Sequence, residues 1–276
     1  MSRFFKLLNM ELNRFSKILF GMIVGVFIIQ IAGLMIEGNA YMNKVNDLIM
    51  SGVTKEAIIE DYGIYGMGDY VKSLWFNAPI ALCAGAISLY IFLIWYRDWT
   101  GKHTFIYRLL MLPTSRMNIY FSKLTAVMLL VFFLVSFQLL FLPIESKILE
   151  WFISADYLLD TTVIGLIQVS YLKYIIPPTF TQFILYYGAG FIALTVLFLA
   201  VLFERSFKWK GIILATVYCV GSVIVFVSPI MIIDWLEVGS YFYHSELVII
   251  VCIAGIMIGI ASILLSRYLL NKKVTV

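Results

Sequence analysis

Six long apolar stretches, separated by polar segments, constrain this chain more than any other feature of its sequence. A helix needs about 20 apolar residues to cross the roughly 30 Å hydrocarbon core of a bilayer. Strands of a membrane barrel instead alternate polar and apolar residues over about ten positions. The stretches do not alternate, so they predict membrane-spanning helices. The predicted spans are Ile18–Ile36, Leu74–Tyr96, Ile119–Ile144, Thr181–Phe203, Gly211–Ile233 and Leu247–Ser266.

The composition agrees with a membrane protein. Hydrophobic residues make up 62% of the chain and charged residues only 13%, against roughly 45–50% and 25% in globular proteins. We therefore expect an all-α polytopic protein in which residues 1–276 form a single membrane domain surrounded by the lipid bilayer.

Basic residues are distributed unevenly among the connecting segments. Of the 20 basic residues, all but Lys44, Lys55, Lys72, Lys147 and Lys173 lie before span one, between Arg97 and Lys123 at the start of span three, between spans four and five, or after span six. Cytoplasmic loops carry an excess of Lys and Arg. This predicts a multi-pass cell-membrane protein with both termini in the cytoplasm and residues 37–73 and 145–180 as external loops. The net charge of +4 then reflects orientation and does not indicate a nucleic-acid partner.

Residues 1–17 precede the first span and have one apolar and one basic face. The apolar face contains Phe4, Phe5, Leu8, Leu12, Phe15 and Leu19, and the opposite face contains Arg3, Lys6, Asn9, Asn13, Arg14 and Lys17. Such a helix is expected to lie in the membrane interface, with its basic face toward water and anionic headgroups. Two roles remain open, namely anchoring alone or anchoring combined with contact to a partner protein.

Each long external loop is expected to contain helical structure. In residues 37–73, Thr54 is a plausible N-cap and Gly63 a stop signal for a helix over Lys55–Tyr62. In residues 145–180, the apolar segment 161–176 is short and contains polar residues, and a crossing there would move the basic segment 205–210 outside. Segment 161–176 is therefore interpreted as an external helix, either interfacial or re-entrant.

The segment between spans two and three, residues 97–118, is predicted to be a cytoplasmic coupling loop. Its apolar residues recur at the spacing of one helical stripe, and Pro113 should end that helix because proline disfavours helical geometry in the preceding residue. The stripe contains Phe105, Ile106, Leu109 and Leu110, and the charges around it include Arg97, Asp98, Arg108 and Arg116. The helix either inserts into a groove on a cytoplasmic partner or is a solvated loop whose charges only fix the topology.

Residues that carry enzyme or cofactor chemistry do not form a recognisable pattern. No predicted span has Asp, Glu, Lys or Arg in its middle third, whereas ion-coupled transporters usually place an ionisable group there. The sequence lacks a phosphate-binding loop, and its histidines are predicted on opposite sides of the membrane. We therefore expect no catalytic residue, no metal site and no cofactor site within this chain.

The segment from Arg97 to Lys123, with its setting in the chain, resembles the permease subunits of ABC-2 type ATP-binding cassette transporters. In that family the loop between spans two and three carries an acidic residue, Gly and Thr, a Leu-rich helix, Pro, Ser-Arg and then a Lys that opens span three. The matching positions are Asp98, Gly101, Thr104, Leu109–Leu112, Pro113, Ser115, Arg116 and Lys123. Asp98 replaces the Glu that is more usual at this position. The large external loops follow spans one and three here, whereas some family members carry a large external element before the last span, so gating residues are not assigned from the resemblance.

The resemblance implies the permease subunit of a bacterial exporter, without enzymatic activity of its own. A second permease subunit, identical or different, would complete a dimer, and separate ATPase subunits would hold ATP and Mg²⁺. The residues expected to contact the ATPase subunit are Arg97, Asp98, Phe105, Ile106, Arg108, Leu109, Leu110 and Arg116.

Cargo is expected to be hydrophobic or amphipathic, such as a peptide, an antibiotic or a lipid-like molecule, because the centres of the spans lack charge. Possible lining residues are Phe27, Gln30, Phe76, Tyr90, Tyr218 and Phe226, and for each of them packing is the alternative role. A second hypothesis for the whole chain is a non-transporting scaffold or sensor that binds a ligand outside and a partner inside.

Overall fold

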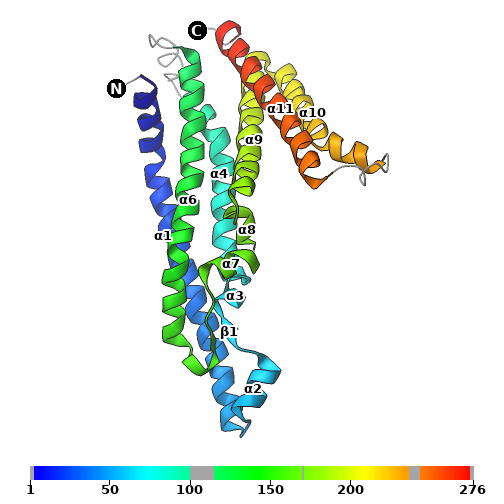
Figure 1. The fold of residues 1–276 in the computed structure, drawn as a ribbon. Coiled ribbons are helices and arrows are strands. Elements are labelled where there is room, and N and C mark those ends of the chain that lie inside the picture. Colours follow the sequence, from blue (N-terminus) through cyan, green and yellow to red (C-terminus); the bar gives the residue numbers. More distant parts are fainter. Residues whose placement is uncertain (1–2, 100–114, 170, 236–242, 274–276) are drawn as a thin grey trace. The chain divides into compact units, whose positions relative to one another are not determined.

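The computed structural model describes residues 3–99, 115–169, 171–235 and 243–273. Six of its helices are long and apolar enough to cross a membrane (Figure 1). They are α1 (Arg3–Met50), α4 (Leu74–Trp99), α6 (Arg116–Phe152), α9 (Phe180–Phe207), α10 (Trp209–Trp235) and α11 (His244–Lys272). Each predicted span lies within one of these helices, so the prediction of an all-α chain with six candidate spans is confirmed.

The first helix differs from its prediction. Residues 3–50 form one helix of 48 residues, about 70 Å long at 1.5 Å per residue, so residues 3–17 continue into the first span without a break. Their placement in the membrane interface stays a prediction. No proline occurs in this stretch, and the change from an amphipathic to a wholly apolar pattern does not itself interrupt helical hydrogen bonding. The burial pattern largely follows the predicted faces, since Leu8 and Phe15 are buried and Lys6 and Lys17 are exposed. Phe5 is exposed against the prediction, and Leu7 and Glu11 are buried in addition.

The chain divides into two compact units. The first unit comprises Met1–Asn13, Ser88–Met128 and Ile184–Val276, and the second comprises Arg14–Ile87 and Leu129–Phe183. Each unit has its own buried groups and is described separately.

Short elements of the two predicted external loops pack together in the second unit. They are α2 (Lys55–Tyr62), β1 (Tyr65–Gly66), α3 (Met67–Tyr70), the 3₁₀ helix η1 (Ala155–Tyr157), β2 (Leu158–Leu159), α7 (Val163–Val169) and α8 (Leu172–Ile175). Strand β1 pairs in parallel with β2, with Tyr65 opposite Leu158. Because β1 and β2 come from different loops, this pairing joins the two loops directly.

The predicted helix over Lys55–Tyr62 is confirmed as α2. Thr54 occupies its N-cap position, although its side chain makes no capping hydrogen bond. Gly63 ends the helix with φ of +73°, a conformation that glycine adopts without steric cost, and its N–H donates to the carbonyl of Ile59 at 3.0 Å.

Within its described residues, segment 161–176 forms no membrane-spanning helix. Its two helices, α7 and α8, contain seven and four residues, far below the roughly 20 needed for a crossing. The prediction that this segment does not cross the membrane therefore agrees with the fold, and its interfacial or re-entrant placement stays a prediction.

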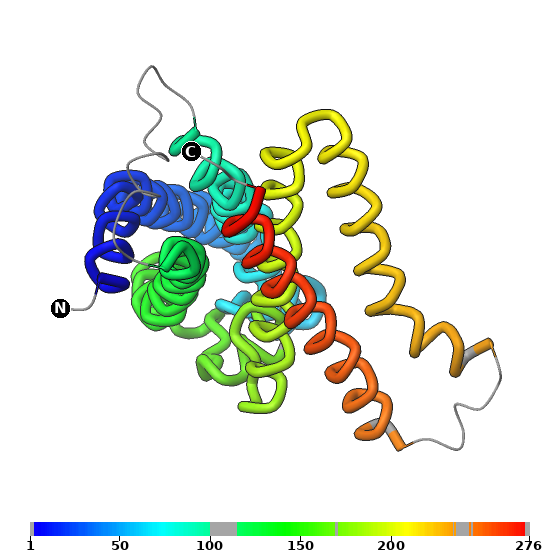
Figure 2. The backbone as a smooth tube through the Cα atoms, turned by 90° about the horizontal axis from the view of Figure 1, so that it is seen from above, coloured from blue at the N-terminus to red at the C-terminus, as the bar shows by residue number. Residues whose placement is uncertain are grey.

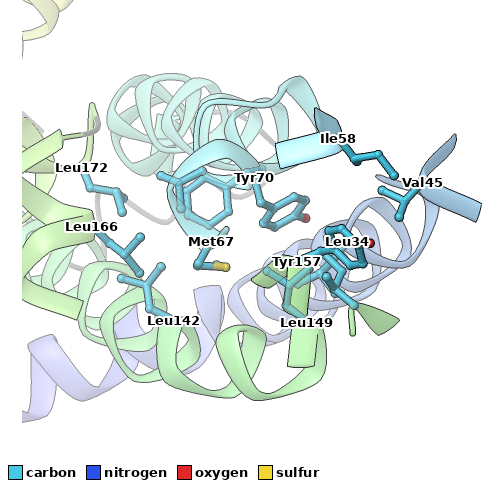
Figure 3. Packing of buried hydrophobic residues seen from close by; sticks show 13 residues of the cluster. Leu34, Val45, Ile58, Met67, Tyr70, Leu142, Leu149, Tyr157, Leu166 and Leu172 are labelled. Carbon is cyan, nitrogen blue, oxygen red and sulfur yellow. The ribbon is translucent and has the colours of Figure 1, made fainter. Parts of the chain in front are cut away.

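A hydrophobic cluster holds the short elements of the second unit against α1, α4 and α6. Buried members include Leu34, Met67, Tyr70, Phe76, Leu142, Leu149, Leu166 and Leu172. In Figure 3 the Tyr70 and Met67 side chains point toward Leu142, Leu149 and Leu34 on the long helices. Nearby, the Tyr65 hydroxyl donates to Glu37 at 2.9 Å. Burial, and then this hydrogen bond, raise the pKa of the Tyr65 hydroxyl well above its ordinary range.

A tight turn in the first unit joins α9 to α10 (Figure 2). Only Lys208 separates the two helices, and it has φ of +52°. Gly211 follows in the first turn of α10, where an added Cβ atom would lie 2.0 Å from the carbonyl oxygen of Phe203. The close approach of the two helices therefore requires glycine at position 211.

Candidate functional site

Four charged side chains meet where the first unit brings α1, α4 and α6 together. Glu11 comes from α1, Arg97 and Asp98 come from the last turn of α4, and Lys123 lies near the start of α6. We call these four residues the ionic cluster. The Lys123 side chain is fully buried, and those of Glu11 and Asp98 are 1% exposed. Arg97 is 36% exposed, so it forms the solvent-facing edge of an otherwise buried cluster.

Lys123 is the centre of the ionic cluster. Its Nζ lies 2.7 Å from Glu11 Oε1, 2.5 Å from Asp98 Oδ2 and 2.8 Å from the carbonyl oxygen of Ile94. An ammonium group has three N–H donors, and each has an acceptor here. The Trp95 ring adds a cation–π contact at 5.4 Å. The position of Lys123 is thus fixed from both α1 and α4.

Arg97 completes the charge balance. Its Nη2 lies 2.7 Å from Glu11 Oε2, so Glu11 accepts from Lys123 with one oxygen and from Arg97 with the other. Two carboxylates face two cations, which compensates part of the large cost of removing charges from water. Removing a single member would leave a buried charge without compensation.

Aromatic side chains surround the ionic cluster on the same helices. The rings of Trp95, Tyr120 and Phe198 pack with centroid distances of 5.4 Å for Trp95–Phe198 and 5.6 Å for Tyr120–Phe198. Both contacts are edge-to-face, the arrangement that ring quadrupoles favour. This packing places α9 against the helices that carry the charges.

A second polar contact joins the last turn of α4 to the end of α9. The Tyr96 hydroxyl donates to the Glu204 carboxylate. The guanidinium of Arg205 lies 4.5 Å from the Tyr96 ring centroid and 5.1 Å from that of Trp99. The last turn of α4 is therefore held from α1, α6 and α9 at the point where the predicted coupling loop begins.

The predicted coupling residues have different positions in the chain. Arg97 and Asp98 belong to the ionic cluster, and Arg116 donates from Nη1 to the carbonyl of Leu270. The remaining residues, Phe105, Ile106, Arg108, Leu109 and Leu110, lie outside the described part of the chain. Their roles stay predictions.

Of the residues predicted to line a cargo path in the second unit, Gln30 and Phe76 lie together. The Gln30 amide nitrogen donates to the Phe76 carbonyl at 3.1 Å and faces the Gln138 amide at 3.5 Å. Both Gln30 and Phe76 are fully buried. Phe27 is exposed, and its ring centroid lies 4.6 Å from that of Phe141. For Gln30 and Phe76, the structure shows packing and a polar contact within the core.

The other predicted lining residues belong to the first unit. Tyr90 is buried in α4, and the Tyr218 hydroxyl shares a hydrogen bond of 2.8 Å with Ser262. Phe226 lines an apolar cavity of about 540 Å³ between α9, α10 and α11. Among these three, Phe226 is the residue that faces open space of the size an apolar ligand would need.

Sequence reasoning missed Glu11 as a site residue. At about 100° per residue, its position lies roughly 20° from that of Phe4, on the apolar side of the first helix and away from the basic face. An acidic residue on the apolar face of a helix would be buried there, and a buried carboxylate needs a cation beside it. Its position is therefore a sequence signal for an ion pair. Lys123 was singled out by the resemblance described above, but only the fold showed that Glu11 and Asp98 both contact it.

Glu145 is a second buried carboxylate, in the second unit. It is fully buried, and neither carboxylate oxygen has a hydrogen-bond partner among the residues that the structure describes. It follows Gln138 and Leu142 on the same face of α6. Unlike Glu11, it has no cation beside it in the described chain.

No metal site emerges from the described ranges, where no group of three His, Cys, Asp or Glu side chains is arranged to hold an ion. Comparison of the chain with protein-family models, with curated proteins and with solved structures finds no match.

Proposed function

We propose that this chain is the permease subunit of an ATP-driven ABC exporter of the ABC-2 type. In this proposal a separate ATPase subunit supplies the energy, and residues 97–118 transmit its movement to the membrane helices. The ionic cluster is the observation that carries the proposal. It joins Asp98, where the predicted loop begins, to Lys123, just after the loop ends, and it links both to α1 through Glu11.

These contacts would allow the loop to transmit movement to the membrane helices. A loop whose two ends are held by buried charge-assisted contacts moves with its helices, because those contacts resist independent displacement of either end. Contacts from Tyr96 to Glu204 extend the connection to α9. Binding of a partner to the loop would then tilt several helices together as a rigid body.

Apolar cavities favour hydrophobic or amphipathic cargo. The second unit contains one of about 270 Å³, lined by residues that include Val26, Cys83, Leu134 and Gln138. The cavity beside Phe226 in the first unit is similarly apolar. Ligand sites are mostly apolar with a few polar groups that orient the ligand, and Gln138 has that character.

The decisive experiment uses the predicted loop stripe. Arg108→Glu combined with Leu109→Asp should abolish co-purification with a candidate ATPase subunit that the unchanged chain retains, because it reverses a predicted polar contact and puts a charge into the stripe. Tyr268→Asp with Lys272→Glu provides a matched control, since both side chains are exposed near the end of α11. Unimpaired complex formation by the loop variant would exclude the coupling assignment.

A scaffold or sensor function is the second candidate. It is favoured by the packed layer of short elements in the second unit, where β1 and β2 join two loops predicted to be external. Such a layer could bind a ligand without a translocation path. Reconstituted complexes distinguish the two functions, because only an exporter should show ATP-dependent cargo movement in sealed vesicles.

A further inference from the structure

A cavity of about 470 Å³ in the first unit lies between the start of α6 and the end of α11. Its polar side contains Ser115, Arg116, Arg267 and Asn271, and its apolar side includes Phe121 and Leu264. Cationic and apolar groups thus face one space at the end of the molecule that is predicted to be cytoplasmic.

No acidic residue is among the described residues that line this cavity. Arg116 donates to the Leu270 carbonyl, which holds its guanidinium at the wall formed with α11. Arg267 is exposed and forms no ion pair with any residue of the described ranges. Arg267 therefore brings to the cavity a positive charge that no carboxylate of the described residues neutralises.

The apolar side lies deeper along both helices. Leu264 precedes Arg267 by about one helical turn, and Phe121 follows Arg116 by more than one turn, which corresponds to about 5–8 Å of helix length. Leu264 is 58% exposed, so the cavity opens on the surface of α11. Guanidinium groups at headgroup depth and apolar side chains at acyl-chain depth match the two parts of a phospholipid.

We propose that this cavity binds an anionic phospholipid, with its phosphate at Arg116 and Arg267 and the first part of an acyl chain along Phe121 and Leu264. Guanidinium groups match phosphate oxygens in geometry and charge, and basic pockets between helices on the cytoplasmic side bind anionic headgroups. A free phosphate ion would use the arginines but would leave the apolar side unfilled. The proposal does not depend on the chain being a permease.

The test uses the full-length protein in detergent, with bound lipid counted by native mass spectrometry and the midpoint of thermal unfolding measured in parallel. Phosphatidylglycerol should bind about tenfold more tightly than phosphatidylcholine with the same acyl chains and should raise the midpoint. Inorganic phosphate should do neither. Arg267→Gln should remove most of the preference for phosphatidylglycerol, and Leu264→Trp should weaken its binding without a change of charge.

Lys272→Gln is the matched control, because it removes one positive charge from the same helix at a residue outside the cavity. It should leave the lipid preference unchanged. If Arg267→Gln and Lys272→Gln reduced the preference for phosphatidylglycerol equally, the preference would come from the overall positive charge of this region. That result would exclude a specific site at Arg267. Two results would exclude a phospholipid as the occupant. One is that inorganic phosphate raises the unfolding midpoint as much as phosphatidylglycerol does. The other is that Leu264→Trp binds as much phosphatidylglycerol as the unchanged protein.

Discussion

Lys123 compensates two buried carboxylates, so its removal should destabilise the protein strongly. In Lys123→Met, Glu11 and Asp98 would lose their shared cation while remaining buried. Breaking a buried ion pair in this way costs about 3–5 kcal/mol. We expect the midpoint of thermal unfolding in detergent to fall markedly, and a triple variant that adds Glu11→Gln and Asp98→Asn to recover part of the loss.

Lys147→Met is the control for this variant. Lys147 pairs with Glu150 at 2.8 Å, but its side chain is 74% exposed, and solvent-exposed ion pairs contribute little to stability. An equal loss of stability in the two lysine variants would show that the ionic cluster is not a buried structural unit.

Glu145 and Glu11 offer a direct comparison of an unpaired and a paired buried carboxylate. Leaving a buried polar group unsatisfied costs about 1–3 kcal/mol, so Glu145→Leu should stabilise the protein by about that amount. Glu11→Leu should destabilise it, because Lys123 and Arg97 would lose an acceptor. Thermal unfolding of the two variants measures this opposition in sign. A destabilised Glu145→Leu variant would mean that this carboxylate has a partner beyond the described residues.

At the scale of elements, the turn between α9 and α10 depends on close backbone approach. Gly211→Ala would place its Cβ atom 2.0 Å from the Phe203 carbonyl oxygen, and backbone must shift to relieve such a contact. We expect lower thermal stability and reduced yield of folded protein. Gly221→Ala in the same helix meets nothing within 4 Å and should be neutral or stabilising by up to about 1 kcal/mol, because alanine favours helix over glycine. The same response in both variants would contradict the proposed close packing.

Elements also differ in how far the sequence predicts them. The helix over Lys55–Tyr62 was predicted to the residue because its limits depend on the local signals of Thr54 and Gly63. The end of α1 at Met50 lay beyond the predicted span, since hydropathy marks where a helix can contact lipid and not where it stops. The pairing of β1 with β2 involves two residues from each strand, too few for a periodic pattern.

At the scale of the whole molecule, the number of crossings determines which connections share a side of the membrane. The predicted topology, six crossings with cytoplasmic termini, would put position 103 on the inner side and position 173 on the outer side. In a background that lacks Cys83, Cys219 and Cys252, a membrane-impermeant maleimide should label Lys173→Cys in intact cells and His103→Cys only in inside-out vesicles. Labelling of both positions from one side would require an additional crossing, for which α7 and α8 are too short.

By itself, the sequence determined the helical class and the six candidate spans, because the length and hydropathy of a segment are properties of consecutive residues. Tertiary structure decided which charges meet, joining Lys123 to Asp98 across 25 positions and to Glu11 across 112. It also left Glu145 without such a partner in the described chain. The physical reason is that helix formation follows local periodicity, whereas a buried ion pair depends on which helices pack together, and a single sequence carries no repeating signal for that choice.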